Sequence, residues 1–593
     1  NIAIITENGV GDKDNYISID CSEDGELKLD NTSGDVFITA LRPFEEGVSS
    51  LTIGQLKTSG ELNIALQGRK LLAKDQDNSL VSSGLNITDA YSIGTEETPV
   101  NNRFTGYAEL DLTAEESIYM NQEGDAYVNR IAAGDTVSLI TIPAGNQAGN
   151  IIDASAEGTP AVTADHIILI TTGEDASVGT PDKKITLELK GTDNELDLES
   201  VNDIYAAVGS VTDSEGNAAD LNIKLAYSVE GSIVIDINNN NNKTVTLTRV
   251  DAGVSAAINT ANNDVAIDSV YAPEVTVKVT DGSIINGADD ADKENIIAGR
   301  VDLEAGKTGE MTGDIGAKDK PIVITPMPLA GGDNAIYASA DGNIYLKLKQ
   351  SEEAEPGDVN RAEISIDAGK EAVLNTEGNT IITEASDIKA ESDITINTED
   401  SLDIQTDSLY TENGSVSITA GEDLTTGSIS APNGSVKLEA GGSITSEGIT
   451  AQDGIEASAG EKLTLKDVDA GSVKINSGSD AEIFVKENAV ITGIDEQSKV
   501  GGDLLITGSG KESAVIDDLE INGDLTAGTK DGSLKTVTVN KTAPDGKLNI
   551  FAEESAAADI DGDLTLGTVT AKSAVIKVNN GTMINGLDDE EKD

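Results

Sequence analysis

Cysteine, histidine and tryptophan are almost missing from this sequence of 593 residues. It has one cysteine (Cys21), one histidine (His166) and no tryptophan, and aromatic residues make up only 3% of it. One cysteine excludes a disulfide within the chain, and Cys21 is expected to be a small buried residue. One histidine excludes a metal site built on two imidazoles. A serine–histidine–aspartate triad would have to use His166, which stands beside the buried-strand signal Ile167–Ile170 and is interpreted as a solvated or corner residue.

Basic residues are scarce compared with acidic ones. Lysine and arginine number 40 against 106 aspartates and glutamates, which gives a formal net charge of −66 at pH 7. Such a charge repels nucleic acids and anionic bilayers, so neither is expected as a partner. No apolar run approaches the roughly 18 to 20 residues of a membrane-spanning helix, so no membrane insertion is expected. We interpret the acidic excess as a solvated surface that keeps an extracellular protein soluble.

Glycine and small aliphatic residues are what the sequence has in abundance. There are 60 glycines, and the apolar residues are mostly valine, isoleucine, leucine and alanine. The composition keeps this character over a length that exceeds one ordinary domain. We therefore expect one repetitive architecture with a thin, layered core.

Internal repeats of about 20 residues are the strongest signal in the chain. Asn413–Pro432 reads NGSVSITAGEDLTTGSISAP, and Asn433–Gln452 reads NGSVKLEAGGSITSEGITAQ. The apolar residues of the two segments correspond one for one, which predicts that they stack inside adjacent coils. The corresponding pairs are Val416 with Val436, Ile418 with Leu438, Ala420 with Ala440, Leu424 with Ile444, and Ile429 with Ile449.

The pattern inside each unit predicts short strands. Apolar residues alternate with polar ones, as in Val436–Ala440, which is the period of a strand with one buried face. Asn-Gly, Asp-Gly and Gly-Gly pairs close the strands, because these residues tolerate sharp turns. Three strands and three corners fit in ~20 residues, and stacked coils pair in parallel ~4.8 Å apart. The predicted fold is all-β: a right-handed parallel β-helix (β-solenoid) of ~20 residues per coil, an elongated rod with loop insertions.

A longer repeat lies over the short one and suggests how the chain is organised. Blocks at about 93–119, 178–205 and 315–345 each open on Ile-Gly or Val-Gly and close on Ile-Tyr. We expect less regular solenoid coils over residues 1–130. Residues 131–593 are expected to form a continuous solenoid that contains these blocks and has regular ~20-residue coils from about 386 onward.

A leader motif precedes the blocks and bears on the length of the native protein. Gly282–Gly287 reads GSIING, and Gly581–Gly586 reads GTMING. The earlier copy is followed by a complete block through Tyr345. We therefore expect the chain to be an internal segment of a longer protein.

These units together resemble a known group of proteins. The Asn-Gly-Ser units, the Gly-Asp-Leu units that start at Gly502, Gly523 and Gly562, and the Ile-Gly to Ile-Tyr blocks are similar to those of the filamentous-haemagglutinin-like and leukotoxin-type giant β-helix adhesins of diderm bacteria. The similarity is one of pattern, covers most of the chain from about Ser92 onward, and is strongest over Asn413–Gln452 and Gly282–Leu348. It implies a right-handed parallel β-helix, export to the bacterial cell surface or medium, and a role in attachment.

The function expected from these observations is structural and adhesive. We expect a stalk or fibre segment of a secreted bacterial surface protein, without catalytic residues, that meets a glycan or protein receptor on a host or another cell. One alternative is a polysaccharide lyase or hydrolase on a β-helix scaffold. Against it, aromatic residues for sugar rings are few, and His166 is followed by isoleucine where β-helix pectinases have His-Gly. Another alternative is a subunit of an extracellular filament that stacks end to end.

Calcium is the one cofactor that the sequence admits. The densest acidic cluster comprises Asp289, Asp290, Asp292 and Glu294, and carboxylates are the ligands that calcium prefers. Asp588, Asp589 and Glu590 repeat this cluster near the end of the chain. A solvated loop is the other interpretation of both stretches, because the glycine-rich calcium-binding nonapeptide is not found.

Overall fold

The chain folds as two compact units. The computed structural model describes residues 1–586 except 22–24, 32, 42–48, 77–78, 239–241, 307–311, 328–333, 351–359, 378–379, 383–386, 399–403, 496 and 543. Unit 1 comprises Asn1–Ala298 and Asp302–Gly313, and unit 2 comprises Gly299–Val301 and Asp314–Asp593.

Parallel β-strands form all of the regular secondary structure of the described residues. They run from β1 (Ile2–Thr6) to β58 (Met583–Asn585) with no helix between them. The strands wind into β-solenoid turns of about 22 residues each. The predicted fold class is therefore confirmed, with a turn slightly longer than the expected ~20 residues. The right hand of the coil stays a prediction that rests on the chirality of parallel crossovers.

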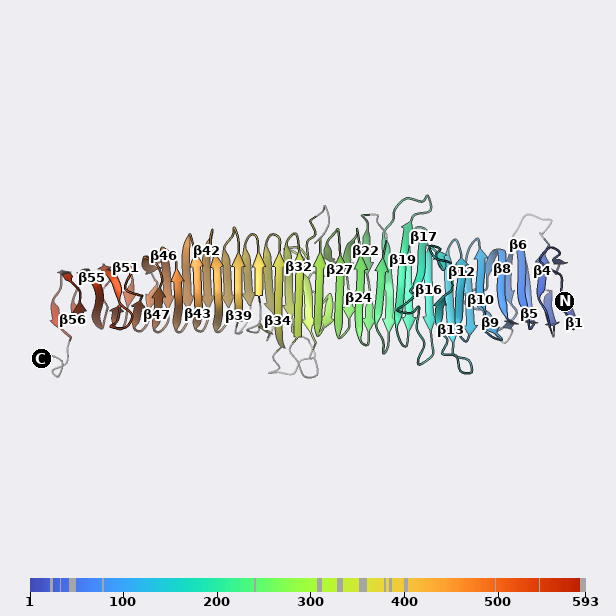
Figure 1. Cartoon of the computed structure of the whole chain (residues 1–593), viewed down its shortest axis with the longest axis horizontal. Coiled ribbons are helices and arrows are strands. Elements are labelled where there is room, and N and C mark those ends of the chain that lie inside the picture. Colours follow the sequence, from blue (N-terminus) through green and yellow to red (C-terminus); the bar gives the residue numbers. More distant parts are fainter. Residues whose placement is uncertain are drawn as a thin grey trace. The chain divides into compact units, whose positions relative to one another are not determined.

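The regular coils of unit 2 show how the repeat folds, and Figure 1 shows their strands side by side between β39 and β47. Each coil has one straight strand and one longer strand that bends at a glycine or aspartate, as β41 does at Gly427 and β45 at Asp467. The bend divides the longer strand in two, which gives the three segments expected per coil. The strands are β40 (Val416–Ala420), β41 (Leu424–Ala431), β42 (Ser435–Ala440), β43 (Ile444–Ala451), β44 (Gly454–Ala459) and β45 (Leu463–Asp469).

The apolar ladders predicted from the sequence are confirmed in these coils. Val416 pairs with Val436 and Val436 with Ile455, and all three side chains are at most 2% exposed. Burial of this kind is worth about 1.5–3 kcal/mol per large aliphatic side chain. The remaining predicted pairs, Ile418 with Leu438, Ala420 with Ala440, Leu424 with Ile444 and Ile429 with Ile449, are also in register.

Aspartates at the corners bind each coil to the next. Asp480 Oδ1 accepts the backbone N–H of Asp503 at 2.9 Å. Asp503 Oδ1 accepts that of Asp524 at 2.7 Å, and Asp524 Oδ1 accepts that of Lys547 at 2.6 Å. Each of these N–H groups precedes or opens a strand, so the carboxylate satisfies a donor at the corner. Unit 1 has the same arrangement in Asp125 with Asn150, Asp203 with Ser232, and Asp264 with Ser283. Part of the acidic excess is thus structural.

The Gly-Asp-Leu units mark successive coils with one displacement. Leu504 pairs with Leu525, as their spacing predicts. Leu525 pairs with Leu548, which pairs with Leu566 rather than with Leu564. The third Gly-Asp-Leu unit therefore lies two coils beyond the second, with its leucine two residues before the residue that stacks in this column.

Each predicted block spans one coil, with its opening and closing motifs stacked. Gly316 has a φ of 69°, and a Cβ there would lie 2.4 Å from the carbonyl oxygen of Tyr345. Only glycine fits this close approach at a positive φ. The glycine of Ile-Gly and the tyrosine of Ile-Tyr are therefore two parts of one contact. The residues that pair are Ile93 with Ile118, Val178 with Ile204, and Ile315 with Ile344.

Candidate functional site

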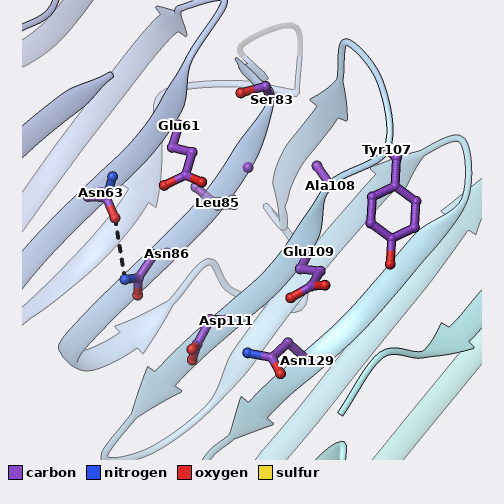
Figure 2. Close-up of a pocket in the computed structure, with 11 residues that line it drawn as sticks. Glu61, Asn63, Ser83, Leu85, Asn86, Tyr107, Ala108, Glu109, Asp111 and Asn129 are labelled. Carbon is purple, nitrogen blue, oxygen red and sulfur yellow. Dashed lines mark hydrogen bonds between the residues drawn. The ribbon is translucent and has the colours of Figure 1, made fainter. Parts of the chain in front are cut away.

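A hollow of about 470 Å³ lies on the flank of unit 1, and its lining makes it the best candidate site. Four coils contribute to it through β6 (Glu61–Ala73), β8 (Gly84–Ile93), β10 (Glu109–Ala114) and β12 (Ala126–Ala132). We call it the acidic groove. Its side chains are those of Glu61, Asn63, Ser83, Leu85, Asn86, Tyr107, Ala108, Glu109, Asp111 and Asn129 (Figure 2).

Two local departures from regular stacking open the acidic groove. Gly84 pairs with Glu61 and has no side chain to continue that column. A Cβ at Gly84 would lie only 3.2 Å from Cγ of Glu61, so the Glu61 side chain lies over the position that glycine leaves without a side chain. Between β10 and β12 the register shifts after Leu110, and Asn129 has no partner residue on β10. A bulge of this kind re-aims a side chain, and Asn129 lines the groove as a result.

A pair of amides on the floor has hydrogen-bonding capacity to spare. Asn86 Nδ2 donates to Asn63 Oδ1 at 3.4 Å, a long contact that Figure 2 marks. Asn63 is only 7% exposed. Among the described residues, the buried atoms Asn63 Nδ2 and Asn86 Oδ1 have no hydrogen-bond partner. Leaving a buried polar atom unpaired costs about 1–3 kcal/mol. Neither atom has appreciable accessible surface in this structure, so a ligand reaches this donor and this acceptor only when the two side chains turn toward the groove.

Carboxylates and a tyrosine complete the walls of the acidic groove. The column Asn63–Asn86 continues through Asp111 on the next coil, and Glu61 and Glu109 lie beside it. The Tyr107 ring is 67% exposed and packs on Tyr127 with 4.2 Å between ring centroids. Burial, with the nearby charge of Asp125, raises the pKa of Tyr127. Tyr107 thus presents an aromatic face that is backed by a second ring.

His166 lies in a separate chain of alternating charges in unit 1. It opens β16 (His166–Thr171), is half-buried, and its Nε2 lies 2.9 Å from Asp197 Oδ2. The hydrogen bond to Asp197 raises the pKa of His166 above its ordinary 6.5, although burial opposes the shift. Glu195 Oε2 lies 4.0 Å from Nε2 and 3.0 Å from the ammonium of Lys224. The imidazole thus pairs with carboxylates through Nε2.

The acidic loop proposed for calcium does not form a cluster of ligands. Asp289, Asp290 and Asp292 are exposed, and Glu294 is half-buried. Asp290 Oδ1 accepts the backbone N–H of Asp292 at 3.0 Å, which is a contact within a turn. In the part of the chain that the structure describes, no three acidic, histidine or cysteine side chains are grouped to hold a metal ion. Calcium binding stays an untested prediction, and the copy at Asp588, Asp589 and Glu590 lies outside the described residues.

Two further buried residues with titratable side chains, Cys21 and Asp153, lie outside the acidic groove. Cys21 is 5% exposed, as expected, and burial raises the pKa of its thiol. Asp153 is buried, which alone would raise its pKa, but hydrogen bonds from Thr186, Ser155 and Lys183 outweigh burial and hold that pKa below its usual value. Thr186 belongs to β17 (Ile185–Lys190), which lies beyond β14 (Ile151–Asp153) in the chain, so Asp153 connects segments of the solenoid.

Sequence reasoning did not identify the acidic groove. Its residues are spread over four coils between Glu61 and Asn129, and no sequence motif marks them. The spacing of Tyr107 and Tyr127 by about one coil was the available signal. Of the described residues, none forms a helix long and apolar enough to cross a membrane.

Comparisons with family models, with curated protein sequences and with solved structures give no match to this chain.

Proposed function

We propose that this chain is a structural and adhesive segment of a secreted bacterial surface protein. The observation that carries the proposal is the ladder architecture: coil after coil commits its inward side chains to the coils on either side, as Val416, Val436 and Ile455 do. Each added coil extends such a stack by ~4.8 Å. In a protein built in this way, added residues lengthen a rigid stack of coils.

The surface chemistry supports an extracellular place for this segment. The net charge of −66 favours solubility and opposes contact with anionic membranes and nucleic acids. The chain has one cysteine, so its stability comes from stacking and does not depend on disulfides. Both properties suit a fibre that is exported and then folds by adding coils.

Attachment and surface exposure can be tested on the source cells and on beads. Antibodies against the chain should label intact cells, and beads coated with the full chain should adhere to host or partner cells more than beads coated with albumin. Labelling that appears only after permeabilisation would contradict the proposal. The polysaccharide-degrading alternative predicts new reducing or unsaturated ends when the chain is incubated with neutral and acidic glycans.

A further inference from the structure

We propose that the acidic groove of unit 1 binds a neutral saccharide. The inference rests on the proposed adhesive function, for which it supplies the class of receptor. It starts from the two buried amide atoms that lack partners, Asn63 Nδ2 and Asn86 Oδ1. One is a donor and the other an acceptor, and both belong to side chains that line the same hollow.

The unpaired amide atoms select the chemistry of the ligand. A sugar hydroxyl donates one hydrogen bond and accepts others, so once the two side chains turn toward the groove, adjacent hydroxyls can satisfy Asn63 Nδ2 and Asn86 Oδ1 together. An ammonium or guanidinium group has donors only and would leave the N–H of Asn63 unpaired. A metal ion is disfavoured because no three ligands are grouped among the described residues. The hydroxyl therefore fits the floor of the groove better than a cation does.

The walls exclude acidic ligands and accept neutral ones. Glu61, Glu109 and Asp111 are acceptors that sugar hydroxyls can satisfy, whereas a uronate, sulfate or phosphate would meet like charge. An anionic saccharide also has to approach a chain of net charge −66. These side chains thus distinguish a neutral sugar from the acidic polysaccharides that many β-solenoid enzymes degrade.

Tyr107 provides the surface on which a sugar ring can stack. Its ring is 67% exposed and is supported by Tyr127 from the next coil. The C–H face of a pyranose packs on such a ring, while its hydroxyls point to the amides and carboxylates. The volume of about 470 Å³ lies within the ~300–1,000 Å³ range of small-molecule sites. The groove is therefore suited to a short stretch of a glycan chain.

Binding of the full chain to defined oligosaccharides tests this proposal. The probes are neutral oligomers of glucose, galactose, mannose and N-acetylglucosamine, with galacturonate oligomers as the acidic comparison. We expect saturable binding of at least one neutral oligomer and none of the uronates. Tyr107→Ala should weaken binding roughly 3- to 10-fold, from the worth of an aromatic contact. Asn63→Ala should weaken it about tenfold, because it removes the unpaired donor.

The matched control is Tyr271→Ala, which removes another exposed tyrosine of unit 1 (44% exposed) that does not line the groove. It should leave binding unchanged, and thermal melting should show that all three variants fold. Preference for uronates, or equal binding by wild type and Tyr107→Ala, would overturn the proposal. Bead adhesion without any saccharide binding would refute this site and leave the adhesive function, whereas new reducing ends from a bound oligomer would refute the non-catalytic function and leave the site.

Discussion

The regular coils of unit 2 and the coils around the acidic groove in unit 1 contain the same apolar ladders but differ in how regularly their strands pair. From β40 to β45 the strands pair almost residue for residue, with inward and outward side chains alternating in step from coil to coil. From β6 to β12 the pairing shifts register in three strand pairs, and the groove lies among those strands. Regular stacking extends the solenoid, whereas the shift after Leu110 brings Asn129 into the lining of the groove, where we propose that a saccharide binds.

The largest effect is expected from breaking a ladder in the regular coils. Leu438 is fully buried between Ile418 and Ala457, so Leu438→Ala should cost about 2–5 kcal/mol of unfolding free energy. Lys437→Ala, on the outward face of the same strand, should cost less than about 0.5 kcal/mol. Urea unfolding followed by circular dichroism measures both. Equal losses would mean that the two faces do not differ as the structure has them.

A smaller effect is expected at the corners. Asp503→Ala removes the acceptor for the N–H of Asp524 and should cost about 1 kcal/mol. Asp503→Asn keeps an oxygen at that position and should restore most of the loss. Glu520→Ala, which removes an exposed carboxylate near the same coil, is the control for charge alone. If Glu520→Ala cost as much as Asp503→Ala, electrostatics rather than capping would explain the result.

Unit 1 should differ from the regular ladders in its response to pH. Because folding raises the pKa of His166, its pairing with Asp197 stabilises fully below the unfolded value of 6.5 and is lost as the pH rises through the folded pKa. His166→Gln should therefore lower the melting temperature at about pH 5.5 and have little effect at about pH 9. The Leu438→Ala loss should be the same at both values. A His166→Gln effect that grows with pH would contradict the assigned pairing.

The smallest effect concerns a polar ladder inside unit 2. Thr426 is 1% exposed, and its hydroxyl has no hydrogen-bond partner among the described residues. Thr426→Val replaces an unsatisfied hydroxyl by a methyl group of similar size, so stability should be unchanged or rise by up to about 1 kcal/mol. Thr425→Val, on the outward face, is the control. A clear loss for Thr426→Val would indicate a partner for the hydroxyl in solution.

The sequence was sufficient to predict the fold where the repeat is regular. Val416 and Val436 were assigned to one ladder because their neighbours correspond at the same offset, and the structure pairs them. The stacking of Ile315 on Ile344 followed less directly, since the block predicted a unit without showing that its two motifs meet. The Gly-Asp-Leu units predicted the number of coils between them but not the exact pairing, since Leu548 stacks on Leu566 and not on Leu564.

The acidic groove could not be predicted in the same way. Its opening depends on an absent side chain at Gly84 and on the bulge at Asn129, and neither glycine nor asparagine is unusual in this chain. The pairing of Asn63 with Asn86 depends on the length of the coil between them, which varies in unit 1. Local sequence fixes the turns, whereas the site depends on how successive turns are aligned.

Filling the groove tests most directly whether the hollow beside Gly84 is the binding site. The measurement is a calorimetric titration of the wild-type chain and of Gly84→Gln with the best neutral oligosaccharide, with reducing ends assayed in the same samples. A Cβ at residue 84 lies 3.2 Å from Cγ of Glu61, so the Gln side chain would displace Glu61 and extend into the groove that both residues line. We predict saturable binding by the wild type without new reducing ends, and at least roughly tenfold weaker binding by a Gly84→Gln variant of unchanged melting temperature. Equal affinity of the two proteins would contradict the account.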